Sequence, residues 1–173
     1  MKAHKFLAAG AVGPISGFAW PAGAWVEAEG PLAPCSRGIH VCRPGDLAHW
    51  IHDDELWELE VDGEPIEGLD CLVVARARLV RPIEGWRPDG GRRFAAACVA
   101  HAASLTSAPP AAGPVEAREL LDDARFMVGE GYVALAAYTA ALAVSRAELG
   151  ADSEAVYRAE RAWQSAWIGE EIL

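Results

Sequence analysis

Two stretches of sequence decide the fold: ELWELEVD at residues 55–62 and CLVVARARLVR at residues 71–81. Apolar and polar side chains alternate along residues 57–62 of the first stretch and along residues 75–79 of the second. This alternation predicts β-strands, because successive side chains of a strand point to opposite faces. In the first stretch Trp57, Leu59 and Val61 share one face. We place the rest of the fold around these two strands.

The polar faces of the two strands carry opposite charges. If the strands pair antiparallel, Glu58 can face Arg78 and Glu60 can face Arg76. Oppositely charged side chains across such a pair contribute about 0.2–1 kcal/mol each. We therefore predict an antiparallel pair with these two ion pairs, connected by residues 63–70.

The remainder of the first half predicts short strands separated by glycine and proline. Strands are expected at Lys2–Leu7, at residues 24–28 and at residues 38–42, where the sequence GIHVC alternates and contains β-branched residues. A short helix is expected at residues 46–51, because Pro44 suits the first turn of a helix.

The second half is rich in alanine, and its apolar residues recur at spacings of three and four, which predicts helices. The expected helices are 91–105, 115–128 and 132–149, and a last helix capped by Asp152 or Ser153 that runs to about residue 170. A proline-rich loop is expected at residues 107–114, and Gly150 is a normal stop residue. Trp163 and Trp167 are expected to pack between the last helix and the sheet.

These elements predict the α+β class. Residues 1–88 would form a small, mostly antiparallel sheet, and residues 89–173 would supply alanine-rich helices that pack on it. A chain of 173 residues fits one compact domain.

Charge and hydropathy exclude some classes of partner. The chain has 25 acidic and 15 basic residues, a formal net charge of -10, so neither nucleic acid nor an anionic membrane is expected as a partner. No stretch approaches the roughly 18 apolar residues of a membrane span, and glycine and proline interrupt the first apolar run too early for a signal peptide. We expect a cytoplasmic protein. In that compartment Cys35, Cys42, Cys71 and Cys98 would be reduced thiols.

The densest group of reactive side chains is CSRGIHVC at residues 35–42, with His49 shortly after it. His40, on a strand beside a turn, is the predicted catalytic acid or base. Arginine suits an anionic group of a substrate, and tryptophan suits the walls of a pocket. The predicted substrate-binding residues are Arg37, Arg43, Trp20, Trp50, Trp57 and His49.

Other interpretations of this segment stay open. Metal ligands could come from Cys35, His40, Cys42, and His49 or His52, but the close Cys-x2-Cys and His-x3-His pairs of zinc sites are absent, and we expect no metal. Cys35 or Cys42 could be a nucleophile with His40 as its base. Alternatively, Cys42 is a small buried apolar residue and His40 a core histidine bound to the backbone. The acidic residues 53–55 are interpreted as a solvated loop that enters a strand.

The first half resembles a domain family of unknown function, found in actinobacterial hypothetical proteins and phage proteins. The resemblance covers about residues 2–87 and rests on a Cys-x2-Gly-aromatic/Ile-His-x-Cys signature. The matching features are CSRGIHVC at 35–42, Trp50, LWELEV at 56–61, VARARLVR at 74–81, and Trp86. The resemblance implies no established activity.

A second resemblance concerns ADP-ribosyltransferase-like domains. GIHV at residues 38–41, a helix with Ala48 and Trp50, and a strand ending in ELEV at residues 58–61 are similar to the middle of such domains. Those domains place a histidine, an aromatic residue and an acidic residue around a nicotinamide dinucleotide. The resemblance implies that His4 could match the histidine.

Three functions follow as hypotheses. The first is an enzyme without a bound cofactor, which acts on a small molecule by acid–base chemistry in a pocket near His40. The second is a non-catalytic binding or interaction module. The third is transfer of ADP-ribose from a nicotinamide dinucleotide.

Overall fold

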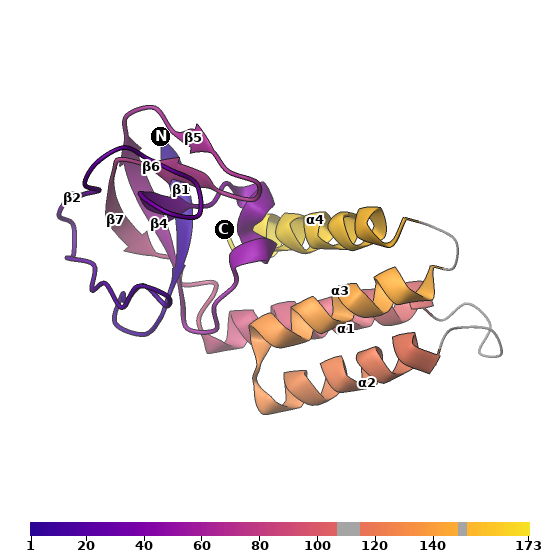
Figure 1. Ribbon diagram of the computed structural model, residues 1–173. Coiled ribbons are helices and arrows are strands. Elements are labelled where there is room, and N and C mark those ends of the chain that lie inside the picture. The colour runs from indigo at the N-terminus through magenta and orange to yellow at the C-terminus, as the bar shows by residue number, and fades with distance from the viewer. Residues whose placement is uncertain (107–114, 149–151) are drawn as a thin grey trace.

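The structure, a computed structural model, describes residues 1–106, 115–148 and 152–173. The predicted loop at 107–114, the expected end of the third helix at Leu149 and its stop at Gly150 lie outside the described residues. Antiparallel sheets occupy the N-terminal half and four helices the C-terminal half, so the predicted α+β class is confirmed (Figure 1).

The larger sheet has four strands in the order β1-β4-β7-β2, and all neighbours are antiparallel. Its strands are β1 (Lys2–Leu7), β4 (Glu55–Asp62), β7 (Arg76–Pro82) and β2 (Val26–Glu27). Because successive side chains of a strand point to opposite faces, apolar side chains of this sheet contribute to a hydrophobic core on each face. Residues such as Ala3, Leu7 and Leu59 enter one core, and Phe6 and Leu56 enter the other.

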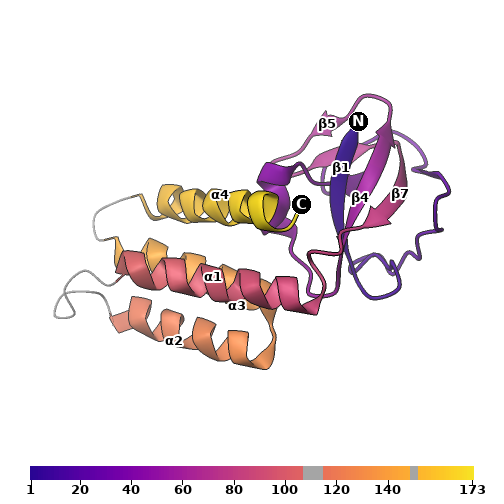
Figure 2. The ribbon, with the colours of Figure 1, turned by 180° about the vertical axis from the view of Figure 1, so that it is seen from behind.

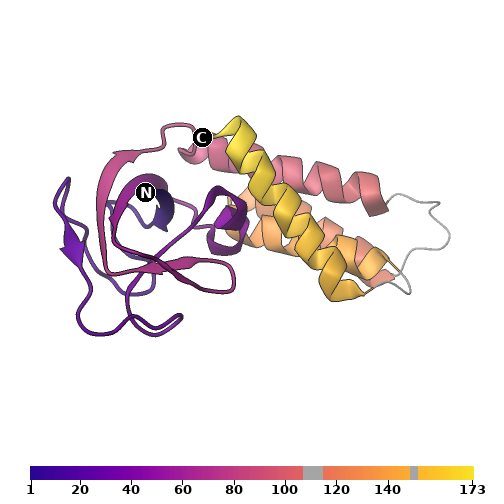
Figure 3. The same ribbon diagram turned by 90° about the horizontal axis from the view of Figure 1, so that it is seen from above.

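The smaller sheet has the order β3-β6-β5, with β3 (Ile39–Val41), β6 (Leu72–Val74) and β5 (Ile66–Glu67). Side chains of both sheets meet in a single core. A bridge between His4 and Cys42 places the His40 strand beside β1. The strands lie together at one end of the molecule, and the helices extend from it (Figure 3). The members of this core that are almost completely buried are Ala3, Leu7, Val41, Leu59, Val74 and Ala77.

The stretch 71–81 forms two strands and not one. β6 and β7 are separated at Ala75, which is exposed and accepts a hydrogen bond from the Ala28 backbone at 2.7 Å. β6 pairs with β3 in the smaller sheet, and β7 pairs with β4 in the larger one. The chain changes sheets at Ala75, so the connection between β4 and β7 is longer than predicted.

The antiparallel pairing of β4 with β7 is confirmed, but the predicted register is wrong. Glu60 faces Arg78, with a 2.5 Å ion pair, and Glu58 binds Arg81 at 2.8 Å and Lys2 at 2.9 Å. Arg76 instead meets Asp62. The longer connection shifts the pairing, and a bulge between residues 58 and 59 shifts it again.

The short predicted helix is a 3-10 helix, η1 (Pro44–Trp50). The four α-helices are α1 (Pro88–Thr106), α2 (Val115–Glu130), α3 (Val133–Ala147) and α4 (Ser153–Glu171). They lie side by side and extend away from the sheets, which they meet at one end through η1 (Figure 2).

Two predictions concern α4. The Asp152 cap is confirmed, because its carboxylate accepts a hydrogen bond from the Glu154 N–H at 3.0 Å. The predicted packing of the two tryptophans on the sheet is wrong: Trp163 stacks on His101 and Trp167 contacts Phe94, both in α1. The most buried face of α4 is largely polar and consists of Glu160, Arg161, Gln164, Ser165 and Ile168.

Candidate functional site

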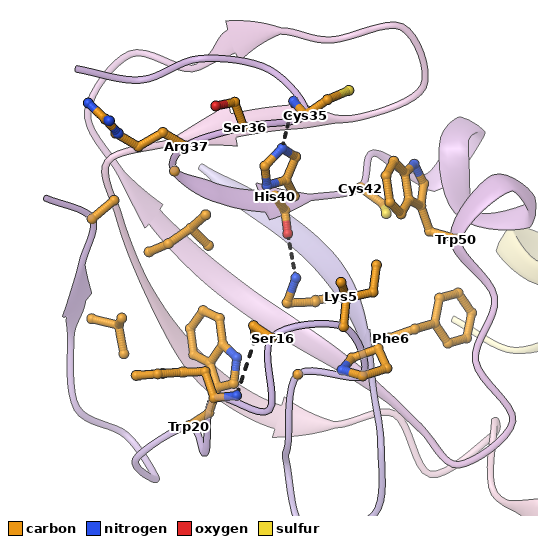
Figure 4. A pocket seen from close by; sticks show the side chains of 18 of the residues that line it. Lys5, Phe6, Ser16, Trp20, Cys35, Ser36, Arg37, His40, Cys42 and Trp50 are labelled. Carbon is orange, nitrogen blue, oxygen red and sulfur yellow. Dashed lines mark hydrogen bonds between the residues drawn. The ribbon is translucent and has the colours of Figure 1, made fainter. Parts of the chain in front are cut away.

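A cavity of about 680 Å³ lies beside His40, in the β-rich half of the molecule (Figure 4). Its wall is built from β1, from parts of residues 13–20, from residues 26–29 and from residues 35–42, with Trp50 at one side. Four of the seven residues predicted for the site line it. They are Trp20, Arg37, His40 and Trp50.

The loop that follows β1 forms the aromatic part of the wall. Trp20 is buried and meets Phe18 edge to face, with 5.8 Å between the ring centroids. The backbone N–H of Trp20 donates to the Ala11 carbonyl at 3.0 Å, and this bond fixes the aromatic wall to the start of the loop. Phe18 is 45% exposed, so it offers an apolar ring to the cavity and to solvent.

Acidic residues at the start of β4 hold this loop in place. The Glu55 carboxylate accepts hydrogen bonds from the backbone N–H groups of Gly10 and Ala11 at 3.0 and 3.1 Å. Asp54 accepts one from Ala9 at 3.0 Å, and Asp53 accepts one from Ala134 at the start of α3. Asp53 and Asp54 are exposed and Glu55 begins β4, as predicted for a solvated loop that enters a strand, and all three carboxylates also bind backbone N–H groups.

Arg37 lies in the turn before β3, and His40 lies in β3 itself. The turn contains Gly38 with φ +119°, where an added Cβ would lie 2.4 Å from Cγ1 of Val73. Only glycine fits this position. Cys35, also at positive φ, donates its backbone N–H to Nε2 of His40 at 3.0 Å. The histidine thereby holds the turn that precedes its own strand.

The His40 imidazole is half-buried and lies 6.4 Å from the Trp50 ring, measured between centroids. Burial, helped by the nearby Lys5 ammonium, lowers the pKa of His40. Its ring is therefore uncharged at neutral pH. Since Nε2 already accepts the Cys35 N–H, this nitrogen takes a proton only if the turn releases it.

Lys5 is the functional group that sequence reasoning missed. Its Nζ donates to the backbone carbonyl of His40 at 2.8 Å, and it lines the cavity (Figure 4). Burial lowers the pKa of Lys5. No carboxylate in the described part of the chain forms an ion pair with it. The sequence does contain a signal for this position. Successive side chains of a strand point to opposite faces, which puts Lys5 on the same face of β1 as the buried Ala3 and Leu7.

Arg37 lines the same cavity and is exposed to solvent. Across residues 1–106, 115–148 and 152–173 we find no ion pair of Arg37. Two glutamates also line the cavity, and both are exposed. Glu27 is bound by Arg76 at 3.0 Å, which leaves Glu29 as the acidic group at the edge.

Three predicted residues lie outside the cavity. Arg43 binds the carboxylates of Asp46 and Glu67, each at 2.7 Å. His49 lies 3.9 Å from the Asp70 carboxylate, because η1 carries it away from His40. Trp57 is the cross-strand partner of Lys5, but its indole N–H binds Glu55 beneath the loop.

The thiols divide by exposure. Cys42 lines the cavity but is buried, and burial raises the pKa of its thiol to about 12. Cys35 is exposed. Within the described residues no group of three or more cysteine, histidine or acidic side chains is arranged to hold a metal ion. Cys42 thus has the character of a small apolar residue.

His4, which the second resemblance singled out, is on the opposite face of β1 from Lys5 and is not part of the cavity wall. Burial lowers the pKa of His4, and its Nδ1 is buried without a hydrogen-bond partner. The structure thus does not bring His4 together with His40.

Comparison with protein-family models, curated proteins and solved structures finds no match to this chain. None of the described helices combines the length and apolarity needed to cross a bilayer.

Proposed function

We propose that this protein is an enzyme without a bound cofactor, and that it acts on a small organic molecule by acid–base chemistry in the cavity beside His40. One observation carries the proposal. A single cavity joins an aromatic wall, Phe18 and Trp20, to two cationic side chains without carboxylate partners in the described part of the chain, Lys5 and Arg37. Such a combination suits a ligand with an apolar ring and an anionic group.

The position of each side chain in the cavity gives it a different role. Arg37, at the exposed edge, binds the anionic group, and the aromatic wall contacts the apolar body. Lys5, inside the cavity, donates or accepts the proton, since its lowered pKa brings it closer to neutral pH. His40 acts mainly as a positioning residue, because its carbonyl orients Lys5 and its ring holds the turn that carries Arg37.

A ketone probe tests this proposal. The probe 4-acetylbenzoate has an aromatic ring, a carboxylate, and methyl protons next to a carbonyl. In deuterated buffer, NMR measures both its binding and the rate at which these methyl protons exchange with solvent. We expect the protein to bind the probe and to accelerate the exchange. Binding without acceleration would contradict the enzyme and favour the non-catalytic binding module, and no binding would overturn both.

The two arginines of the region provide a matched pair of variants. Arg37→Gln removes the cation at the cavity edge, and we expect it to weaken probe binding about fivefold, the effect of roughly 1 kcal/mol for an exposed charge pair. Arg43→Gln removes a cation outside the cavity and should leave binding unchanged. Equal effects of the two variants would mean that the probe binds through overall charge and not in the cavity.

A further inference from the structure

The chain contains two lysines, and the structure places them in opposite environments. The Lys2 side chain is 80% exposed and lies 2.9 Å from the Glu58 carboxylate. Lys5 lines the cavity and has no ion pair with a carboxylate of the described residues. An amine in an apolar cavity without a counter-ion loses its proton more easily than an exposed, paired one. The two side chains are therefore expected to differ in nucleophilicity.

One contact fixes the direction of the Lys5 amine. The carbonyl of His40 accepts a hydrogen bond from Nζ at 2.8 Å. In its uncharged form the amine has two N–H bonds and one lone pair, and this contact uses one N–H only. The lone pair thus remains available to a ligand. Trp20 lies on another side of the cavity and Arg37 at its edge (Figure 4).

The geometry points to Lys5 as a nucleophile that forms a Schiff base with a small aldehyde or ketone bearing an apolar ring and an anionic group. This inference rests on the proposed function and names its substrate class. The lowered pKa of Lys5 supports it, since a desolvated lysine in an apolar pocket is a recognised way to activate an amine.

The step balances without an external oxidant or reductant. The lone pair of Nζ attacks the carbonyl carbon, a C–N bond forms, and the C=O π electrons move to oxygen, which takes up a proton from solvent. The nitrogen, now positively charged, gives one of its two protons to this hydroxyl group. Water then leaves as the C–O bond breaks, the nitrogen lone pair forms the C=N bond, and a protonated imine remains. A proton on the adjacent carbon becomes acidic, because the imine accepts the electron pair left behind. Addition of water hydrolyses the imine, which restores the Lys5 amine and releases the carbonyl compound.

Reductive trapping of an aldehyde tests the inference on the unmodified protein. The probe is 4-formylbenzoate, with sodium cyanoborohydride to reduce the C=N bond at neutral pH, and acetaldehyde serves as a smaller second probe. Peptide mass mapping then compares Lys5 with Lys2 and with the α-amino group of Met1 in the same molecules. We expect Lys5 to be labelled by 4-formylbenzoate several times faster than Lys2. Equal rates, or no labelling of Lys5 by either aldehyde, would overturn the inference.

Variants add a second test. Lys5→Arg keeps a cation but removes the nucleophile, so it should abolish the preferential label, whereas Lys2→Arg should retain it. Circular dichroism and the thermal midpoint check that each variant folds, and the comparison of the two lysines in the wild-type chain needs no variant.

Failure of the inference is distinguishable from failure of the proposed function. If 4-acetylbenzoate binds and its methyl exchange is accelerated while no aldehyde is trapped on Lys5, the Schiff base is wrong and general acid–base catalysis stands. If the ketone does not bind and Lys5 is not labelled, both are wrong.

Discussion

The hydroxyl of Ser165, in α4, accepts a hydrogen bond from the backbone N–H of Ala48, in η1, at 3.0 Å. The carbonyl of Ala48 accepts a hydrogen bond from the buried guanidinium of Arg161. Arg161 in turn donates to Gln164, whose amide donates to the Ala137 carbonyl in α3. Both backbone groups of one η1 residue are therefore bound by a single helix. This network joins the β-rich half to the helical half.

Replacement of Ser165 by alanine should destabilise the whole fold. The variant leaves the buried N–H of Ala48 without an acceptor, which costs about 1–3 kcal/mol. The free energy of unfolding, measured by denaturant titration, should fall by this amount. Ser104→Ala is the control, because that hydroxyl is exposed and bonds within its own helix. An equal loss in both variants would contradict the special role of Ser165.

Local pattern predicted most of the elements but not how β6 and β7 divide. Residues 71–75 are all apolar and alternation with arginine begins at Ala75, but both patterns are typical of strands, so the sequence does not mark Ala75 as the point where the chain changes sheets. That choice depends on pairing with β3, a contact distant in sequence. Apolar spacing likewise identified the two tryptophans of α4, whereas the face buried most deeply is polar and is specified by the backbone of η1.

The candidate site was predicted in part for the same reason. The turn and strand at residues 35–42 brought Arg37 and His40 together locally, and both line the cavity. Lys5 comes from a strand distant in sequence, and its proximity to His40 depends on the bridge between His4 and Cys42. Arg43 and His49 are near His40 in sequence, but η1 turns them toward acidic partners.

Glu55→Gln should loosen the loop that carries Phe18 and Trp20. The carboxylate accepts the N–H groups of Gly10 and Ala11 with two oxygens, and an amide has only one acceptor oxygen. We expect amide hydrogen exchange at these two residues, followed by NMR, to accelerate about fivefold, which corresponds to roughly 1 kcal/mol. Binding of 4-acetylbenzoate should weaken as well.

Glu64→Gln is the matched control for this change, because Glu64 is exposed in the turn after β4. In the Glu64→Gln variant, the amide hydrogens of Gly10 and Ala11 should exchange at the wild-type rate. Unchanged exchange in Glu55→Gln would show that the loop does not depend on the Glu55 carboxylate.

Cys35 should be the only thiol of the native protein that reacts quickly with dithiobis(nitrobenzoate). It is exposed, whereas burial raises the pKa of Cys42 to about 12 and also raises the pKa of Cys71 and Cys98. We expect one thiol per chain to react quickly in buffer and all four thiols to react in guanidinium. Cys35→Ser should remove the fast phase. Because Cys35 lines the cavity, bound 4-acetylbenzoate should slow its reaction, and an unaffected rate would place the ligand elsewhere.

Stability should decrease as the pH falls below about 6.5, the ordinary pKa of histidine. Burial lowers the pKa of His4, His40 and His49 in the folded state. Below pH 6.5 the unfolded chain binds protons that the folded chain resists, so the free energy of unfolding falls with pH. Between pH 7 and pH 5.5 carboxylates contribute little to this slope, since their ordinary pKa values lie near 4.

His4→Gln separates this effect from a general acid sensitivity. The variant removes one buried imidazole that must stay uncharged in the fold, so its unfolding free energy should depend less steeply on pH than that of the wild type. Denaturant titrations of both proteins at pH 7.5 and pH 5.5 give the change of the unfolding free energy with pH for each of them. The loss of stability caused by the variant should be larger at pH 7.5 than at pH 5.5, because the wild-type histidine itself destabilises the fold in acid. A loss that is the same at both pH values would mean that His4 titrates alike in the folded and unfolded chains.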